Sequence, residues 1–273
     1  MPELPEIETI RRSLAPLATG RRISRVQVRC ARLRRPLASD FGSRLKGRRI
    51  ERIGRRAKYL VFDLDDGLSW IVHLGMSGRL VYQQPSDPAA RERHDHVVVY
   101  LGRHGRLVFN DARRFGLMTV EAAAGCDLFA RLGPDALDHD GFNAAHLAAL
   151  KRRTRRSLKD VLMDQTVVAG LGNIYVNEIL FAAGLRPRRR LQRTSHAQLE
   201  RLVAATREVL AEAIEHRGSS ISDFLDGIGR KGGYQWRRRV YDRANEPCPR
   251  CRTPIKAVVV GQRSSFYCPR CQS

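Results

Sequence analysis

The chain has 273 residues, of which 42% are hydrophobic, enough to bury a core in what we expect to be two domains. Its 50 Lys and Arg residues outnumber 28 Asp and Glu residues, and the net charge of +22 points to a polyanionic partner. Membrane surfaces also attract basic patches, but no apolar run is long enough to span a bilayer, so nucleic acid is the partner that we expect.

The chain opens with MPELPEIETI, a stretch that has two interpretations. Prolines are tolerated in a first helical turn, and acidic residues there are favoured by the helix dipole. Ile7, Ile10 and Leu14 recur at helical spacing, which predicts a helix and favours this first interpretation. In the second interpretation the chain terminus is itself a reactive group, and this stretch alone leaves that open.

The positive charge is concentrated after this helix. Residues 11–58 carry 17 Lys or Arg residues against two acids, Asp40 and Glu51, a net +15. Further basic clusters lie at 151–159, 186–193 and 237–243. Part of the excess could serve solubility alone, but so lopsided a segment favours a nucleic-acid-binding face.

Residues 22–120 are predicted to form mainly β-strands. Five short stretches rich in β-branched and aromatic residues support this: RISRVQV, KYLVFDL, LSWIVHL, HVVVYL and RLVF. The tracts DLDDGLSW and LGRHGRL are typical of hairpin turns. Several short strands at close spacing predict a β-sandwich.

From about residue 125 the pattern becomes helical, with helices predicted near 143–151, 157–169, 174–183 and 195–217. Ser195 and Gln198 have capping-box spacing at the start of the last helix, and Gly218 follows its end.

A GLG turn separates two of these helices, and Asn173 is expected to be the N-cap of the helix that follows. A helix N-terminus exposed after such a turn can bind a DNA phosphate, although a plain helical hairpin has the same pattern.

The spacing of four cysteines is the most specific simple motif. Cys248, Cys251, Cys268 and Cys271 form two CPRC pairs separated by 16 residues, which is typical of two zinc knuckles. Two disulfides are the alternative, but we recognise no signal peptide and expect a reducing compartment. Four thiolates leave no open position, so one Zn²⁺ per chain would be structural. Cys30 and Cys126 are expected to be buried thiols without an assigned role.

Eight ordered motifs along the whole chain resemble the bacterial formamidopyrimidine-DNA glycosylases. They are PELPEIET, RRAKYL, HLGMSG, HDH, DARRFG, VVAGLGNIYVNE, GSSISDFL and GQRSSFYCPRCQ. The resemblance implies a glycosylase and AP lyase that removes 8-oxoguanine and formamidopyrimidines from damaged double-stranded DNA and acts as a monomer. An endonuclease VIII-like enzyme for oxidised pyrimidines is an alternative, but that sister group lacks the Met, Arg and Phe set. A non-catalytic DNA-binding zinc protein is the other.

The resemblance implies five catalytic residues. Pro2 would be a secondary amine, freed by removal of Met1, that attacks C1′ and forms a Schiff base. Glu3 would move protons, and Glu6 would support it. Lys58 would act near the reactive sugar, and Arg263 would grip the phosphates around the everted nucleotide. The presence of Pro2, Glu3 and Lys58 favours the enzyme over the non-catalytic alternative.

The resemblance also implies a set of DNA contacts. An enzyme that acts on a base must take it out of the stack. Met76, Arg113 and Phe115 would fill the gap and face the orphaned base. The remaining implied contacts to DNA are His94, Arg155, Asn173 and Tyr241.

We therefore expect an α+β protein with an N-terminal β-sandwich and flanking helices, a helical domain with a helix–two-turn–helix motif, and a four-cysteine zinc-finger hairpin. The predicted boundaries are 1–125 for the catalytic domain, 126–142 for a linker, 143–245 for the helical domain and 246–273 for the zinc finger. A lesion-capping loop is placed at about 218–240. The implied location is the bacterial cytoplasm, on the nucleoid.

Two segments depart from the pattern of the family. Asp242 and Asn245 replace glycines before the zinc site, and both residue types tolerate left-handed backbone. In the loop at 226–239, Gly233 stands where an aromatic residue is common, and the loop is expected to be mobile without DNA. Base preference is therefore the part of the resemblance that this sequence supports least.

Overall fold

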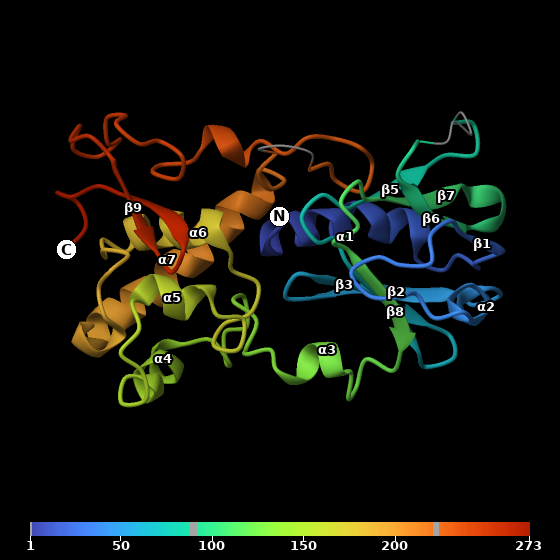
Figure 1. Cartoon of the computed structure of the whole chain (residues 1–273), viewed down its shortest axis with the longest axis horizontal. Helices are drawn as coiled ribbons and strands as arrows, with labels where there is room; N and C mark the ends of the chain where they lie inside the picture. Colours follow the sequence, from blue (N-terminus) through green and yellow to red (C-terminus); the bar gives the residue numbers. More distant parts are fainter. Residues whose placement is uncertain (1, 88–91, 221–223) are drawn as a thin grey trace. The chain divides into compact units, whose positions relative to one another are not determined.

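The computed structural model describes residues 2–87, 92–220 and 224–273 (Figure 1). Residue contacts divide the chain into two compact units. Unit 1 consists of Met1–Ala130 and His216–Gln235, and unit 2 of Arg131–Glu215 and Trp236–Ser273. The contacts thus group part of the expected lesion-capping loop with the first unit; residues 221–223 of that loop lie outside the described residues. The finer domain boundaries stay a prediction.

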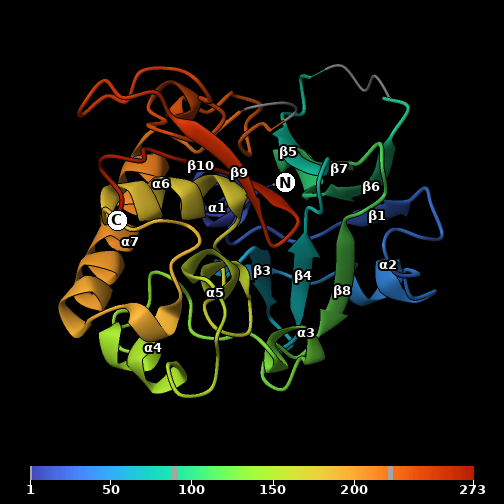
Figure 2. The same cartoon turned by 60° about the vertical axis from the view of Figure 1, so that its left-hand side comes forward.

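Unit 1 contains two antiparallel sheets of four strands, which confirms the predicted β-sandwich. The first sheet has the order β1 (Arg25–Val28), β6 (Asp95–Tyr100), β7 (Arg106–Asn110), β5 (Arg79–Gln83). The second has the order β2 (Ile50–Arg56), β3 (Tyr59–Leu64), β4 (Ser69–His73), β8 (Leu117–Glu121). Figure 2 shows β3, β4 and β8 side by side. The five predicted strands are β1, β3, β4, β6 and β7, and the other three were not singled out.

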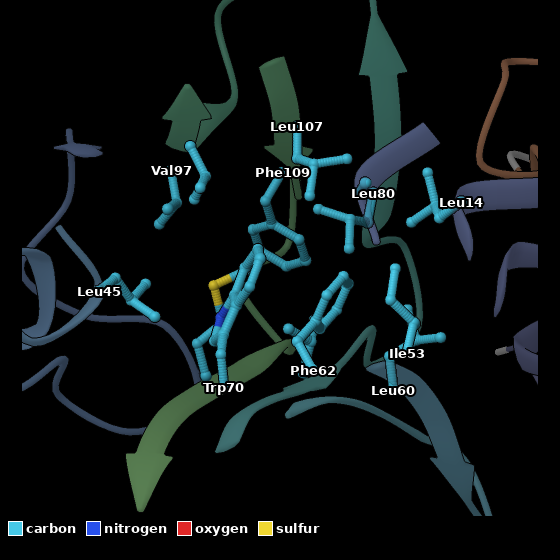
Figure 3. Close-up of a cluster of buried hydrophobic side chains, with 14 of the residues drawn as sticks. Leu14, Leu45, Ile53, Leu60, Phe62, Trp70, Leu80, Val97, Leu107 and Phe109 are labelled. Atoms are coloured by element: carbon cyan, nitrogen blue, oxygen red, sulfur yellow. The ribbon is translucent and has the colours of Figure 1, made fainter. Parts of the chain in front are cut away.

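The core of unit 1 lies between the sheets. Phe62 of β3 and Trp70 of β4 stack with ring centroids 4.4 Å apart. Leu107 and Phe109 of β7 point toward them from the first sheet (Figure 3). The helix α1 (Leu4–Ala18) packs its apolar face on this core, which confirms the first predicted helix. Two short helices and one 3₁₀ turn also lie in the Met1–Ala130 part of unit 1: α2 (Phe41–Leu45), α3 (Asp127–Ala130) and η1 (Gly102–His104).

Unit 2 is helical and ends in a β-hairpin. Its helices are α4 (Ala144–Leu150), α5 (Leu158–Met163), α6 (Asn173–Ala182) and α7 (His196–Glu215), with the 3₁₀ turn η2 (Leu191–Arg193). A second 3₁₀ turn, η3 (Tyr234–Trp236), spans the chain position where the two units meet in sequence. The hairpin pairs β9 (Lys256–Val260) with β10 (Arg263–Tyr267). Ser195 and Gln198 exchange the two capping-box hydrogen bonds, at 2.9 and 3.2 Å, as predicted.

Two details of the helical prediction are wrong. The helix predicted over 157–169 ends at Met163. Asp164 accepts hydrogen bonds from the amide and the hydroxyl of Thr166, a local turn that competes with helix propagation. The N-cap of α6 is Gly172, and Asn173 is the first helical residue. Its side-chain amide donates instead to the carbonyl of Ser264 in the hairpin at 3.1 Å.

Several smaller expectations can be compared with the structure. Asp242 and Asn245 adopt left-handed backbone, with φ of 61° and 66°, so the missing glycines are tolerated. Cys126 is buried as expected, whereas Cys30 is only half-buried. No helix among the described residues is both long and apolar enough to cross a membrane.

Candidate active site and DNA interface

The start of the chain is buried and held by its own acidic residues. Glu3 is the N-cap of α1, and its backbone amide donates to Oε2 of Glu6 at 2.8 Å. This is the capping box that links an N-cap to the third helical residue. Pro2, Glu3 and Glu6 are all buried, and Glu6 is only 1% exposed. The partial positive charge of the helix N-terminus favours carboxylates in this position.

Glu6 also fixes a distant segment of unit 1. Its second oxygen, Oε1, accepts the backbone amide of Ser219 at 2.7 Å. Gly218, just before it, has φ of +71°, and a Cβ there would stand 2.7 Å from the same oxygen. Only glycine fits this close approach in a left-handed conformation. Glu6 therefore ties the chain start to the segment that begins the expected lesion-capping loop.

Lys58 lies in the two-residue turn between β2 and β3, directly after Ala57, which has a left-handed φ of 52°. The side chain is unusually buried for a lysine, at 6% exposure. Burial first, and then the charges of Lys58 and Arg34, lower the pKa of His73 to about 4. Nδ1 of His73 accepts the amide of Gly75 at 3.0 Å, so the neutral ring keeps its proton on Nε2. The Nε2–H group of neutral His73 is therefore a hydrogen-bond donor in the neighbourhood of Lys58.

Two loops of unit 1 expose the residues expected to enter DNA. Met76, in the loop after β4, is 44% exposed, and Phe115, in the loop after β7, is 43% exposed. The guanidinium of Arg113 lies 4.6 Å from the centroid of the Phe115 ring. Here two large apolar side chains lie exposed on neighbouring loops. Their apolar surface and the adjacent guanidinium are the chemistry of an unstacking wedge.

A buried carboxylate and a close backbone contact hold these loops in place. Asp111 accepts the hydroxyl of Ser77 at 2.6 Å and the amide of Gly116 at 2.8 Å. Gly75 has φ of +64°, and a Cβ there would lie 2.4 Å from the backbone of Phe115. Met76 and Phe115 therefore project from two loops that hold each other in place.

His94 lies beside the same loops. It is half-buried in the turn just before β6, and its carbonyl accepts the amide of Asp111 at 3.1 Å. Its side chain lines a surface hollow together with Ser77 and Ala112. The structure thus brings His94 together with the exposed set in unit 1.

In unit 2 the start of α6 and the tip of the hairpin are joined. The carbonyl of Ser264 accepts the side-chain amide of Asn173 and, at 2.7 Å, the ammonium of Lys159. Lys159 is fully buried and also donates to Oγ of Ser265 at 2.6 Å. Arg263, the neighbour of Ser264, is exposed at the first position of β10. Asn173 and Arg263 are therefore presented by one hydrogen-bonded cluster.

The two other residues expected to contact DNA in unit 2 differ in their surroundings. Tyr241 packs edge-on against Phe266 of the hairpin, with ring centroids 5.4 Å apart, and its amide donates to the buried Glu178. Arg155 is exposed ahead of α5 and makes no hydrogen bond or ion pair with any residue that the structure describes. Tyr241 thus belongs to the hairpin cluster, and Arg155 is not tied to it.

Four thiols gather at the base of the hairpin. The Sγ atoms of Cys248, Cys251, Cys268 and Cys271 all lie within 4.8 Å of one another. This compact all-sulfur set fits the tetrahedral coordination of zinc by four cysteines, with no position left for a substrate. Phe266 packs beside Cys248 and Cys268 in a small apolar cluster. The chain carries one structural Zn²⁺, as predicted, and the ion holds the hairpin that presents Arg263.

Sequence reasoning did not single out Asp111, His73 or Lys159. Asp111 and His73 are the first residues of the DARRFG and HLGMSG motifs, so their positions were the available signal. Lys159 lies inside a basic cluster and has no such signal, because only its buried contact with the hairpin distinguishes it.

The chain is basic and exposes an apolar wedge with an arginine, and its zinc-held hairpin is joined to a helix N-terminus. These features define a DNA-binding repair protein of the base-everting class. Comparisons with known proteins identify the family. The chain matches the formamidopyrimidine-DNA glycosylase N-terminal domain over residues 1–118 and the H2TH domain of the same enzymes over 132–225. Residues 245–273 match the zinc finger found in FPG and IleRS.

Relatives and solved structures agree over the full length. The formamidopyrimidine-DNA glycosylases of Dinoroseobacter shibae and Methylococcus capsulatus are 45% and 46% identical to this chain, with complete coverage of both sequences. Lactococcus lactis Fpg in complex with DNA containing an abasic site is 31% identical, with a TM-score of 0.89 over 99% of both chains. The MutM (FPG) protein of Thermus thermophilus is 36% identical, with a TM-score of 0.87 over 99% of this chain and 98% of that one.

The chain belongs to the formamidopyrimidine-DNA glycosylase family. It is a DNA glycosylase of base excision repair with the AP lyase activity of that family, and its partner is DNA. The family assignment and the fold class indicated by the sequence motifs are confirmed. The individual roles of the site residues stay predictions.

Proposed function

We propose that Pro2 is the nucleophile of both reactions. The role requires removal of Met1, which lies outside the residues that the structure describes. A free α-amine has a pKa of about 8, so about a quarter of it is neutral at pH 7.5. The observation that carries the proposal is the buried capping box of Glu3 and Glu6, which gives the chain start a fixed place in unit 1.

In the proposed reaction the nitrogen lone pair of Pro2 forms a bond to C1′ as the bond from C1′ to the damaged base breaks. The departing base takes a proton, and opening of the sugar ring leaves an iminium ion on the proline nitrogen. This cation acidifies the proton at C2′, whose removal breaks the C3′–O3′ bond. A second elimination breaks the C5′–O5′ bond. Glu3, next to the nucleophile, is the proposed proton carrier.

Glu6 is proposed to act by position, because both of its oxygens accept backbone amides in a buried site. Lys58 is proposed to contact the DNA near the reactive sugar, and its burial beside a neutral His73 favours a directed role over a solvated one. Arg263 is proposed to clamp the phosphates around the everted nucleotide, since guanidinium groups bind phosphate in bidentate fashion.

The remaining residues are proposed to bind the duplex. Met76 and Phe115 would enter the stack, and Arg113 would face the base left unpaired. Their exposure on loops fixed by Asp111 supports this proposal. The proposed phosphate contacts are His94, Arg155, Asn173 and Tyr241.

We propose oxidised purines, namely 8-oxoguanine and formamidopyrimidines, as the substrates. A solved relative, a mutant of Lactococcus lactis FPG, forms a complex with DNA containing Fapy-dG, which supports this class. We further propose that the chain acts as a monomer in the bacterial cytoplasm, where DNA binding would hold it on the nucleoid.

Borohydride trapping tests the nucleophile. With an 8-oxoguanine duplex or an abasic duplex, reduction should link the Met-processed protein covalently to DNA, with the new bond at Pro2. Pro2→Gly should reduce the yield of this adduct sharply, and a tag left on the N-terminus should abolish it. Pro5→Gly is the matched control, because it changes a proline of the same turn that is not the terminus. A wild-type adduct mapped to another residue would overturn the assignment.

A further inference from the structure

Trp236 is the most exposed large hydrophobic side chain among the described residues, at 86% exposure. The sequence has only two tryptophans, and the other, Trp70, is fully buried in the sandwich core (Figure 3). A tryptophan is normally buried over most of its surface, because it has the largest apolar area to remove from water. An indole left in solvent is therefore available to pack against a ligand.

Hydrogen bonds hold the chain on both sides of Trp236. Tyr234 is fully buried, and its amide donates to the carbonyl of Gly218 at 3.0 Å. The side chain of Gln235 accepts the amide of Ser220 at 2.9 Å and donates to the carbonyl of Gly232 at 2.8 Å.

On the other side, in unit 2, a single carboxylate fixes three consecutive residues. Glu178, fully buried on α6, accepts the backbone amides of Arg239, Val240 and Tyr241 at 2.8, 3.0 and 2.8 Å. Hydrogen bonds within each unit thus hold the backbone on either side of Trp236 in the structure.

The three arginines that follow Trp236 are not equivalent. Arg239 pairs with Glu212 at 2.9 Å, and Arg238 lies over the ring of Tyr241 and near Asp242. Arg237 is exposed and makes no hydrogen bond or ion pair with any described residue. An exposed indole followed in the chain by an uncommitted guanidinium offers the two groups with which proteins hold nucleic-acid strands, through stacking and phosphate contact.

We propose that Trp236 and Arg237 form a further DNA-binding site of this enzyme. The indole packs on a base or sugar face of the bound strand, and the guanidinium pairs with a phosphate. The ligand is DNA, the established partner of the family, and not a second protein. The site supplies affinity that does not depend on the chemistry at Pro2.

The two tryptophans make a direct test possible. The full-length protein is titrated with a duplex containing a tetrahydrofuran abasic-site analogue, which lacks the C1′ oxygen that a Schiff base needs. Because Trp70 is buried, the red-shifted emission and the quenching by acrylamide both report Trp236. DNA should protect Trp236 from acrylamide, and the protection should disappear in Trp236→Phe. Unchanged quenching at saturating duplex would overturn the proposal.

Binding measurements separate the two side chains. Loss of one stacking contact, about 1–3 kcal/mol, predicts that Trp236→Ala weakens duplex binding by about 5- to 150-fold without changing its salt dependence. Trp236→Phe should retain most of the affinity. Arg237→Gln should lower the slope of log K against log salt by about 0.9, the value for one phosphate contact. Arg201→Gln, an exposed arginine on α7, is the control and should change neither quantity by as much.

Equal affinity of Trp236→Ala and the wild type would refute the site. If Trp236→Ala instead changed only self-association, measured by sedimentation without DNA, the indole would belong to a contact between copies and the proposal would also fail. Because the abasic analogue forms no adduct, either failure leaves the role of Pro2 untouched, and failed trapping leaves this site untouched.

Discussion

The two acceptor oxygens of Glu6 make a sharp prediction about the chain start. Glu6→Gln keeps the size of the side chain but replaces one acceptor with an amide donor. Either the amide of Glu3 or that of Ser219 then loses its partner in a buried site. Leaving one buried donor unpaired costs about 1–3 kcal/mol, and losing a negative charge at the helix N-terminus costs about 0.3–1 kcal/mol. We expect unit 1 to lose about 1–4 kcal/mol of unfolding free energy.

Trp70 reports this loss selectively. In a Trp236→Phe background the only tryptophan lies in the core of unit 1, so its emission during urea unfolding follows that unit. Glu8→Gln is the matched control for trapping, and in urea unfolding it should lose only about 1–2 kcal/mol, the contribution of its own ion pairs. It lies on the same helix and is bound by the side chains of Arg11, Arg12 and Arg55, not by the backbone of the chain start.

Adduct formation with abasic DNA separates positioning from stability. Measured where both variants are folded, Glu6→Gln should trap at least about tenfold more slowly than the wild type, because a misplacement of about 1 Å can cost 100-fold in rate. Glu8→Gln should trap at close to the wild-type rate. Equal trapping by the two variants, or a Glu6→Gln protein as stable as the wild type, would refute the reasoning.

Other predictions concern the loops, the metal, pH and salt. Gly75→Ala places a Cβ 2.4 Å from the backbone of Phe115, so it should lower the thermal midpoint of unit 1 and weaken duplex binding together. Chelation of zinc should weaken binding by releasing the hairpin that carries Arg263, and added Zn²⁺ should restore it. Burial alone would raise the pKa of Glu8, but hydrogen bonds from Arg11 and Arg12 lower it to about 2. The ionised Glu8 should contribute about 1–2 kcal/mol to the unfolding free energy after solvent screening, fully above about pH 4.5 and less as the pH falls toward 2. Urea unfolding of Glu8→Gln should lack this pH dependence. Duplex affinity should fall steeply with salt, and a nearly flat log–log plot would contradict binding through many phosphates.

The limits of prediction follow from what is local in the sequence. The strands β3 and β6 are recognisable because YLVFDL and DHVVVY are rich in β-branched and aromatic residues. The strand β2 has the sequence IERIGRR, and its charged residues hide the strand pattern. Its stability comes from pairing with β3 and from the ion pair of Arg55 with Glu8 on α1, neither of which is visible in the local sequence. The zinc site is predictable because all four ligands occur in two short motifs. The wedge is predictable only through the family resemblance, since an exposed Met or Phe has the same local pattern as a buried one.

The two interpretations of MPELPEIETI are compatible in the structure. The helix interpretation is confirmed, with Glu3 as the N-cap and Glu6 closing the capping box. What the sequence could not reveal is that the other oxygen of Glu6 binds Ser219, 213 positions away. An ordinary capping box leaves a chain end free to move, whereas this one is anchored on both sides and buried. If Pro2 is the nucleophile, the features that begin the helix are also those that hold the amine in place for attack, and Glu6→Gln would disturb both at once.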